Sequence, residues 1–271
     1  MDNPPENNIT AASSTGKQAQ PPRQGLAYEK YTLPCRIEHG ELFIDVEREG
    51  EKGAAGESFV YSRKHGSETA EKMLRATEGY LLFNPVEPIN KPKEITPFFL
   101  IQFRQTLTVK PREIYEIMVT FPVDIACMFV AGEQDYTVLD IFSLTEPKYS
   151  LYGTPKSGLI CRYWESRVYP AAPPSPDPLQ EGVMRISIRN TTSRWVEVTQ
   201  AVFSANEMKI YYNQGKAYAE TYMKILSDTS AETGFSITPP PLHLNLEKSL
   251  ELLAARKMIM SEPKLLMEEG L

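Results

Sequence analysis

Short alternating runs of apolar and polar residues recur along most of the chain. In the clearest run, every second residue from Met184 to Ile188 is apolar and the residues between them are polar. A repeat of two is typical of a half-buried β-strand. Similar patterns occupy residues 42–46, 99–103, 115–121, 208–212 and 217–225, whereas residues 69–75 fit either a short strand or a short helix. The pattern predicts about a dozen short strands.

The segments between these runs carry turn signals. Residues 190–193 (Asn-Thr-Thr-Ser) separate the run that ends at Ile188 from residues 195–198, which predicts a hairpin. The proline-rich stretch 170–178 cannot lie inside a sheet, and a domain linker and a protruding loop that joins two strands fit it equally well. No helical segments alternate with the strands, as a parallel βαβ fold requires. The sequence therefore predicts an all-β fold, mainly an antiparallel β-sandwich or two packed sandwiches.

One segment has the period of a helix. Asn245 can cap it, apolar residues then recur at spacings of three and four as far as Met258, and Pro263 ends it. We expect a C-terminal α-helix whose apolar stripe packs on the body, with an exposed helix that binds a partner as the alternative.

The predicted organisation has three parts. Residues 1–26 are rich in Asn, Gln, Ser and Pro, so we expect a disordered tail that buries too little surface to fold. Residues 27–242 form an all-β globular body, with two halves that meet near residue 145 as the alternative to one unit. Residues 243–271 form the C-terminal helix and a tail packed on that body.

Composition and charge narrow the classes of function. The 271 residues include 29 basic and 35 acidic ones, a net charge of -6, which argues against nucleic-acid binding through bulk charge. The longest apolar run, Ile125–Ala131, is far shorter than the roughly 18 residues of a membrane-spanning helix, and the first residues lack the pattern of a secretory signal. We therefore expect a cytoplasmic protein without a transmembrane segment.

The sequence lacks several common motifs of catalysis and metal binding. Neither a glycine-rich phosphate loop nor the Gly-x-Ser-x-Gly elbow of serine hydrolases occurs. Cysteines 35, 127 and 161 and histidines 39, 65 and 243 are isolated, so we expect no disulfide framework, metal or cofactor. Because Cys127 and Cys161 lie in strand-like segments, we expect these two to be buried free thiols. An acid–base pair of carboxylates is the remaining catalytic option, although acidic side chains at strand ends are more often solvated or paired with Lys or Arg. The candidates are Glu87, Asp124, Asp140, Glu146 and Glu165.

Polar and aromatic residues are dense in two stretches, 144–153 and 161–165. If the stretches are adjacent, basic side chains could hold an anionic group while aromatic rings form a stacking wall. The structural alternative is an Arg–Glu pair packed over aromatic core residues of neighbouring strands. The candidate ligand-binding residues are Lys148, Tyr149, Tyr152, Arg162, Trp164 and Glu165.

The same segments carry a family resemblance. Residues 80–88 (Tyr-Leu-Leu-Phe-Asn-Pro-Val-Glu-Pro), 140–145, 148–153 and 161–164 resemble the archaeal domain-of-unknown-function family 432. Matches continue at residues 181–184, 190–192, 195–199 and 208–212, and the similarity extends from about Tyr28 to Leu271. The resemblance implies an archaeal cytosolic protein but brings no activity, cofactor or catalytic residue. It also implies relatives encoded near small-conductance mechanosensitive channels, and hence a role beside a membrane channel.

Three hypotheses follow. The leading one is a non-enzymatic β-sandwich interaction or accessory module that binds a protein partner through edge strands and aromatic loops. The alternative is a small-ligand or carbohydrate-binding protein, or an enzyme, that uses the polar and aromatic pocket. The second alternative is a binder of single-stranded nucleic acid through basic and aromatic residues on one sheet face.

Overall fold

A computed structural model describes residues 23–53, 56–76, 78–89, 96–132, 135–170, 175–236, 240, 244–252 and 264–271. In these residues the regular structure consists of β-strands and one 3-10 turn at Ala205–Glu207. The predicted all-β class with sheets rich in antiparallel pairs is confirmed.

Two sheets form an N-terminal lobe. Sheet A contains, in spatial order, β1 (Arg23–Gln24), β3 (Cys35–His39), β4 (Leu42–Gly53), β5 (Gly56–His65) and β6 (Glu68–Ala76). Sheet B contains β11 (Tyr136–Phe142), β10 (Asp124–Val130), β7 (Tyr80–Val86) and β2 (Lys30–Thr32). Apolar side chains from both sheets, such as Ile44 and Phe83, meet in one buried core between them. Strand β6 settles the ambiguous segment 69–75 as a strand.

Two further sheets form a C-terminal lobe. Sheet C contains β12 (Lys148–Tyr152), β13 (Leu159–Ser166), β8 (Phe98–Val109) and β15 (Val196–Ser204). Sheet D contains β19 (Glu247–Lys248), β16 (Tyr211–Asn213), β17 (Lys216–Ile225), β14 (Glu181–Asn190) and β9 (Ile114–Pro122), while β18 (Ala231–Phe235) pairs with β17 and with β20 (Leu265–Met267). Their shared core is centred on stacked rings, with the centroids of Phe99 and Phe203 5.3 Å apart.

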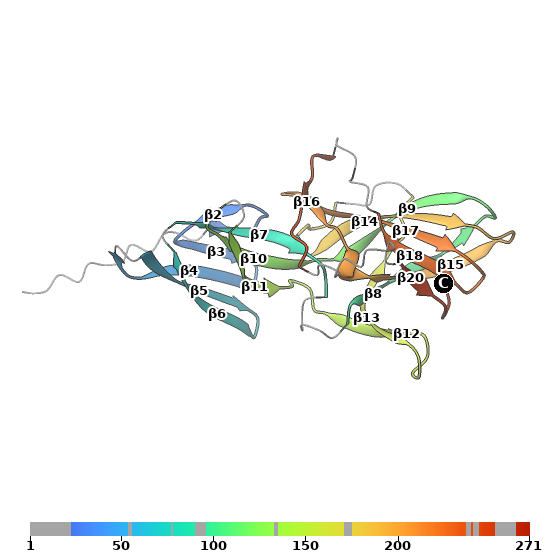
Figure 1. Ribbon diagram of the computed structural model, residues 1–271, viewed down its shortest axis with the longest axis horizontal. Helices are drawn as coiled ribbons and strands as arrows, with labels where there is room; N and C mark the ends of the chain where they lie inside the picture. The colour runs from blue at the N-terminus through green and yellow to red at the C-terminus, as the bar shows by residue number, and fades with distance from the viewer. Residues whose placement is uncertain are drawn as a thin grey trace, which may run out of the picture.

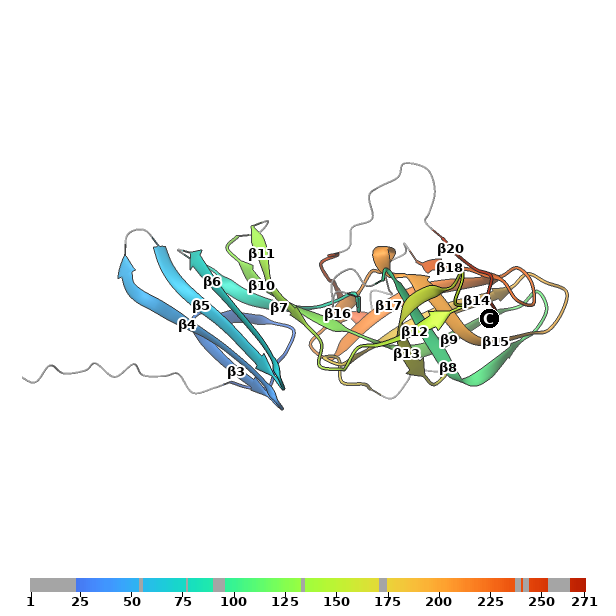
Figure 2. The same cartoon turned by 90° about the horizontal axis from the view of Figure 1, so that it is seen from below.

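The two lobes lie side by side along the long axis (Figures 1 and 2), and consecutive strands of the described residues change lobe three times. These passages between the lobes join β7 to β8, β9 to β10 and β11 to β12. The second passage is very short, because β9 ends at Pro122 and β10 begins at Asp124. Position 145, the proposed meeting point of two halves, lies in the third passage. Each lobe is therefore built from segments that alternate along the sequence.

The predicted C-terminal helix is wrong over the residues that the structure describes. Asn245 has a positive φ of 47°, and Glu247–Lys248 pair with β16 as a strand. The Ser249 amide donates to the Ile210 carbonyl at 2.8 Å and its hydroxyl donates to the Pro85 carbonyl at 2.5 Å. These bonds to two neighbouring segments hold the backbone extended, while Leu250 packs on sheet B. The rest of the predicted helix, residues 253–263, lies outside the described residues.

The predicted hairpin across residues 190–193 is also wrong. Strand β14 pairs with β9 on one edge and with β17 on the other, so it has no edge left for β15. Strand β15 pairs instead with β8, and the turn crosses from sheet D to sheet C. The Asn190 side chain fixes this turn, because its amide donates to the carbonyls of Val109 and Arg194 at 3.0 and 2.8 Å.

Two other predicted segments are described in part. The proline-rich stretch leads from β13 in sheet C to β14 in sheet D, with residues 171–174 outside the described residues. Of the predicted tail 1–26, residues 1–22 lie outside the described residues, whereas Arg23–Gln24 form β1, parallel to β3, and Leu26 is buried.

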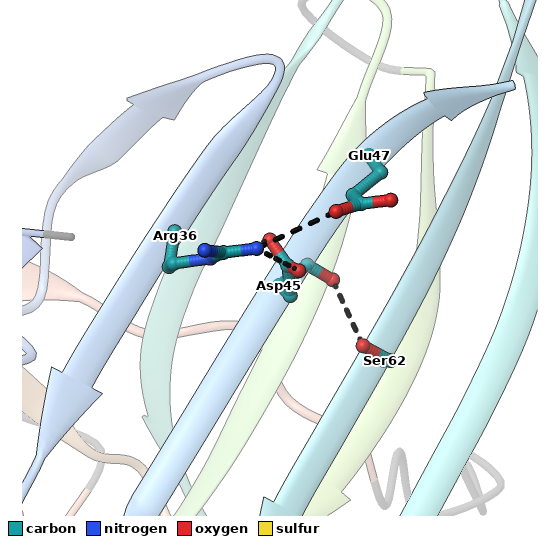
Figure 3. A network of polar contacts seen from close by, with 4 residues as sticks. All are labelled: Arg36, Asp45, Glu47 and Ser62. Carbon is teal, nitrogen blue, oxygen red and sulfur yellow. Dashed lines mark hydrogen bonds and ion pairs between the residues drawn. The ribbon is translucent and has the colours of Figure 1, made fainter. Parts of the chain in front are cut away.

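On the solvent-facing side of sheet A, an arginine forms ion pairs with carboxylates of the adjacent strand. Arg36 lies directly opposite Asp45, and its guanidinium donates to that carboxylate at 2.8 and 3.3 Å and to Glu47 at 3.4 Å (Figure 3). Ser62, on the next strand, donates to the Asp45 carbonyl at 3.4 Å. The bond to Asp45 raises the pKa of the Arg36 guanidinium. The cation is thus matched by carboxylates on the adjacent strand.

Candidate functional site

A cavity of about 700 Å³ lies where the strands of sheets C and D approach the passages between the lobes. Its wall includes Thr120 and Pro122 at the end of β9, residues 144–146 between β11 and β12, and Gln180 and Glu181 at the start of β14. Five consecutive residues of β13, from Arg162 to Ser166, complete much of the wall. The site therefore depends on segments far apart in the sequence.

Hydrogen bonds to strand β9 fix the aromatic part of the wall. Trp164 donates from its indole Nε1 to the Thr120 hydroxyl at 3.1 Å, and the Thr120 amide donates to the Ser166 hydroxyl at 2.8 Å. Because side chains two apart on a strand lie on the same face, Trp164 and Ser166 both reach β9. The Trp164 ring is therefore held in place although it is only partly buried.

A buried ion pair lies beneath the cavity. The Arg162 guanidinium donates to both oxygens of Asp124 at 3.2 and 3.5 Å, and the two side chains are 1% and 0% exposed. Asp124 begins β10 in sheet B and Arg162 lies on β13 in sheet C, so the pair joins the two lobes. Tyr149 lies opposite Arg162; burial raises the pKa of its phenol, and the guanidinium opposes that shift.

The rim of the cavity carries charges of both signs. Arg104 and Glu165 form an ion pair at 3.5 Å with side chains about half exposed (51% and 48%). Besides Arg162, the other charged residues of the lining are Glu146, Lys148, Arg167 and Glu181, and its further aromatic residues are Tyr163 and Tyr169. A wall of this kind can form hydrogen bonds to many hydroxyl groups and can stack on the apolar face of a ring.

The structure brings four of the six candidate residues together in this cavity: Lys148, Arg162, Trp164 and Glu165. Tyr149 contacts Arg162 but does not line the cavity. Tyr152 lies in the core of the C-terminal lobe, where its hydroxyl donates to the Gly270 carbonyl at 2.9 Å and accepts from the Glu269 amide at 3.0 Å.

Sequence reasoning missed the contributions of Arg104, Thr120, Arg167, Tyr169, Gln180 and Glu181. The turn-like residues before β14 and the polar end of β8 carry no local signal of a site, because only the sheet pairing brings them near β13.

Of the five candidate acid–base carboxylates, three form ion pairs with arginine, as the alternative interpretation expects. Asp124 pairs with Arg162, Glu165 with Arg104, and Asp140 with the buried Arg63. Glu146 lines the cavity, and Glu87 is buried beside the first passage between the lobes.

The cysteines are free thiols, as predicted, and Cys127 and Cys161 are buried. Burial raises the pKa of Cys161 to about 12 and that of Cys127 well above the ordinary value of 9.0. Within the described ranges, no three His, Cys, Asp or Glu side chains are placed to hold a metal ion. The same ranges include no helix with the length and apolar character needed to cross a membrane.

Comparison of the chain with known proteins finds a matching family model but no matching individual protein. No curated protein and no solved structure matches the chain. A family model described as a protein of unknown function, DUF432, matches residues 27–268, which is nearly the whole chain. The resemblance seen in the sequence is therefore confirmed, and this chain belongs to the DUF432 family.

Proposed function

We propose that the protein is a binding module for a small carbohydrate, held in the cavity beside β13. The observation that supports this most directly is a cavity of about 700 Å³ whose lining combines aromatic rings with carboxylates and guanidinium groups. Binding sites for small molecules commonly measure about 300–1,000 Å³. The volume therefore suits a ligand of one or a few sugar rings.

The chemistry of the wall suits sugars better than a simple anion. Glu146, Glu165 and Glu181 offset Arg104, Lys148 and Arg167, so the rim has no strong excess of either charge. Carboxylates accept hydrogen bonds from hydroxyl groups and guanidinium groups donate to them, while Trp164 offers a fixed apolar face. Arg162 is neutralised by Asp124 and serves to position the wall.

A glycan array probed with the intact chain tests this proposal, followed by titration calorimetry with the best oligosaccharide. Glu165→Gln and Arg104→Gln should each weaken binding by about tenfold, since one charge-assisted hydrogen bond is lost. Glu197→Gln, an exposed change on β15 of the same sheet, is the matched control. The proposal would be refuted if no glycan binds, or if Glu165→Gln and Arg104→Gln bind the glycan as tightly as the control Glu197→Gln does.

A second candidate, the protein-interaction module, is favoured by one observation. Strand β12 is the edge of sheet C, and Leu151 lies opposite Ile160 with the two residues 41% and 55% exposed. An apolar pair beside an open strand edge can receive a strand of another protein. We propose a cytoplasmic setting for such a partner, because free thiols suit a reducing compartment.

Affinity capture from native lysate, with the wild-type chain and with Ile160→Glu, tests this candidate. A stoichiometric partner should be lost with Ile160→Glu and kept with the control Met73→Glu, at an exposed apolar residue on β6 of the other lobe. Retention of the partner by Ile160→Glu would exclude this edge.

A further inference from the structure

The outer face of sheet D contains two cations placed directly opposite each other. Arg189 on β14 and Lys224 on β17 are partners in the parallel ladder between these strands. Their neighbours Ile188 and Met223 are fully buried in the core, so Arg189 and Lys224 face outward. Adjacent strands are about 4.8 Å apart, which brings the two side chains together on one surface.

Arg189 has no carboxylate as a cross-strand partner, whereas Lys224 also lies opposite Glu232 on β18. Arg189 and Lys224 form no ion pair or side-chain hydrogen bond with any residue in the described ranges. Like charges directly opposite each other destabilise a sheet. Arg36 on the outer face of sheet A forms an ion pair with the carboxylate opposite it (Figure 3), whereas Glu232, the carboxylate opposite Lys224, is bound to Lys264.

The pair lies in a shallow hollow of about 300 Å³ on this face. A third cation, Lys264, and the hydroxyl-bearing side chains of Ser187 and Tyr222 also line it. The carboxylate in the hollow, Glu232, is bound to Lys264 at 2.8 Å. The hollow thus has an excess of positive charge in a protein whose net charge is -6.

We propose that this hollow is a binding site for a phosphate group, bridged between Arg189 and Lys224. Guanidinium and ammonium groups donate strong charge-assisted hydrogen bonds to phosphate oxygens, and a bridging anion removes the repulsion between the two cations. The phosphate can belong to a free ion or to a lipid headgroup. Ile114 and Leu266, which are 58% and 49% exposed, flank the hollow in the same cross-strand row. This site is separate from the cavity beside β13.

Titration of the intact chain with inorganic phosphate, at ionic strength held constant with chloride, tests the site. Wild-type protein should show saturable chemical-shift changes in amides of β14 and β17 and a higher thermal midpoint with phosphate. Arg189→Gln and Lys224→Gln should each weaken phosphate binding about tenfold or more. Lys64→Gln, an exposed change on β5 of the other lobe, is the control.

The variants also report on the repulsion itself. At low salt and without phosphate, Arg189→Gln, which removes the cation without a cross-strand carboxylate, should have a higher thermal midpoint than wild type, whereas Lys64→Gln should not. Equal phosphate affinity in wild type and both hollow variants, or no response to phosphate beyond that to chloride, would overturn the proposal.

Vesicles separate the two sources of phosphate. A lipid headgroup would be supported if the protein sediments with vesicles of phosphatidylcholine and phosphatidic acid but not with vesicles of phosphatidylcholine alone. Free phosphate should then compete with this sedimentation. Phosphate binding without sedimentation would support a free ion. Sedimentation that Arg189→Gln and Lys224→Gln leave unchanged would contradict a role of the hollow at membranes.

Discussion

Removing one partner of the Arg162–Asp124 pair should strongly destabilise the protein. Asp124→Asn keeps the size of the side chain but leaves the guanidinium without its counter-charge in a site where the two partners are 1% and 0% exposed. At the 3.2 Å separation of Nη2 and Oδ1, two unit charges attract by about 1 kcal/mol in water and about 5 kcal/mol at an effective dielectric constant near 20. Breaking a buried pair typically costs about 3–5 kcal/mol, which is the expected loss of unfolding free energy.

Urea unfolding followed by circular dichroism measures this loss. The double variant Asp124→Asn/Arg162→Met removes both charges, so it should lose clearly less stability than the two single variants summed. Arg104→Gln is the control, since its ion pair with Glu165 is about half exposed and should contribute less than about 1 kcal/mol. A loss below about 1 kcal/mol in Asp124→Asn, or additive losses in the double variant, would refute the assigned role of the pair.

Three other predictions concern stability. Gly182→Ala should lose about 1–3 kcal/mol in urea unfolding, because a Cβ there would lie 2.3 Å from the Phe121 ring; an unchanged midpoint would contradict this. Tyr152→Phe should lose about 1–2 kcal/mol, since the hydroxyl bonds to the backbone of two of the last three residues, and calorimetric unfolding checks it. Stability should decrease as pH rises, because burial raises the pKa of Cys161 from 9.0 to about 12 and that of Tyr31 from 10.0 to about 12. The raised values favour the protonated forms in the folded state, so this stability is complete below about pH 9 and is lost toward pH 12; a flat urea midpoint across that window would argue against it.

The sequence could predict part of the candidate site and not the rest. Lys148 and Arg162 lie on two consecutive strands that pair as neighbours, so local density was a sufficient guide to them. Tyr152 lies in the core of the C-terminal lobe, because alternation indicates the face on which a side chain lies but not whether other elements cover it. Arg104 and Glu181 join the site only through pairings that span long stretches of the chain.

The amino-acid sequence by itself determined the all-β class and most strands of the body, because a period of two is a local property of a half-buried chain. It also indicated the family through short runs of consecutive residues. Only the tertiary structure decided that Glu247–Lys248 form a strand, because pairing with β16 and the hydrogen bond that Ser249 donates to β7 outweigh a helical spacing of leucines. Likewise, only the tertiary structure shows that β15 belongs to the other sheet. Both edges of β14 are already paired, so β15 pairs with β8. Hydrogen-bonding partners of a strand are distant in sequence, and their identity depends on which edges the rest of the fold leaves free.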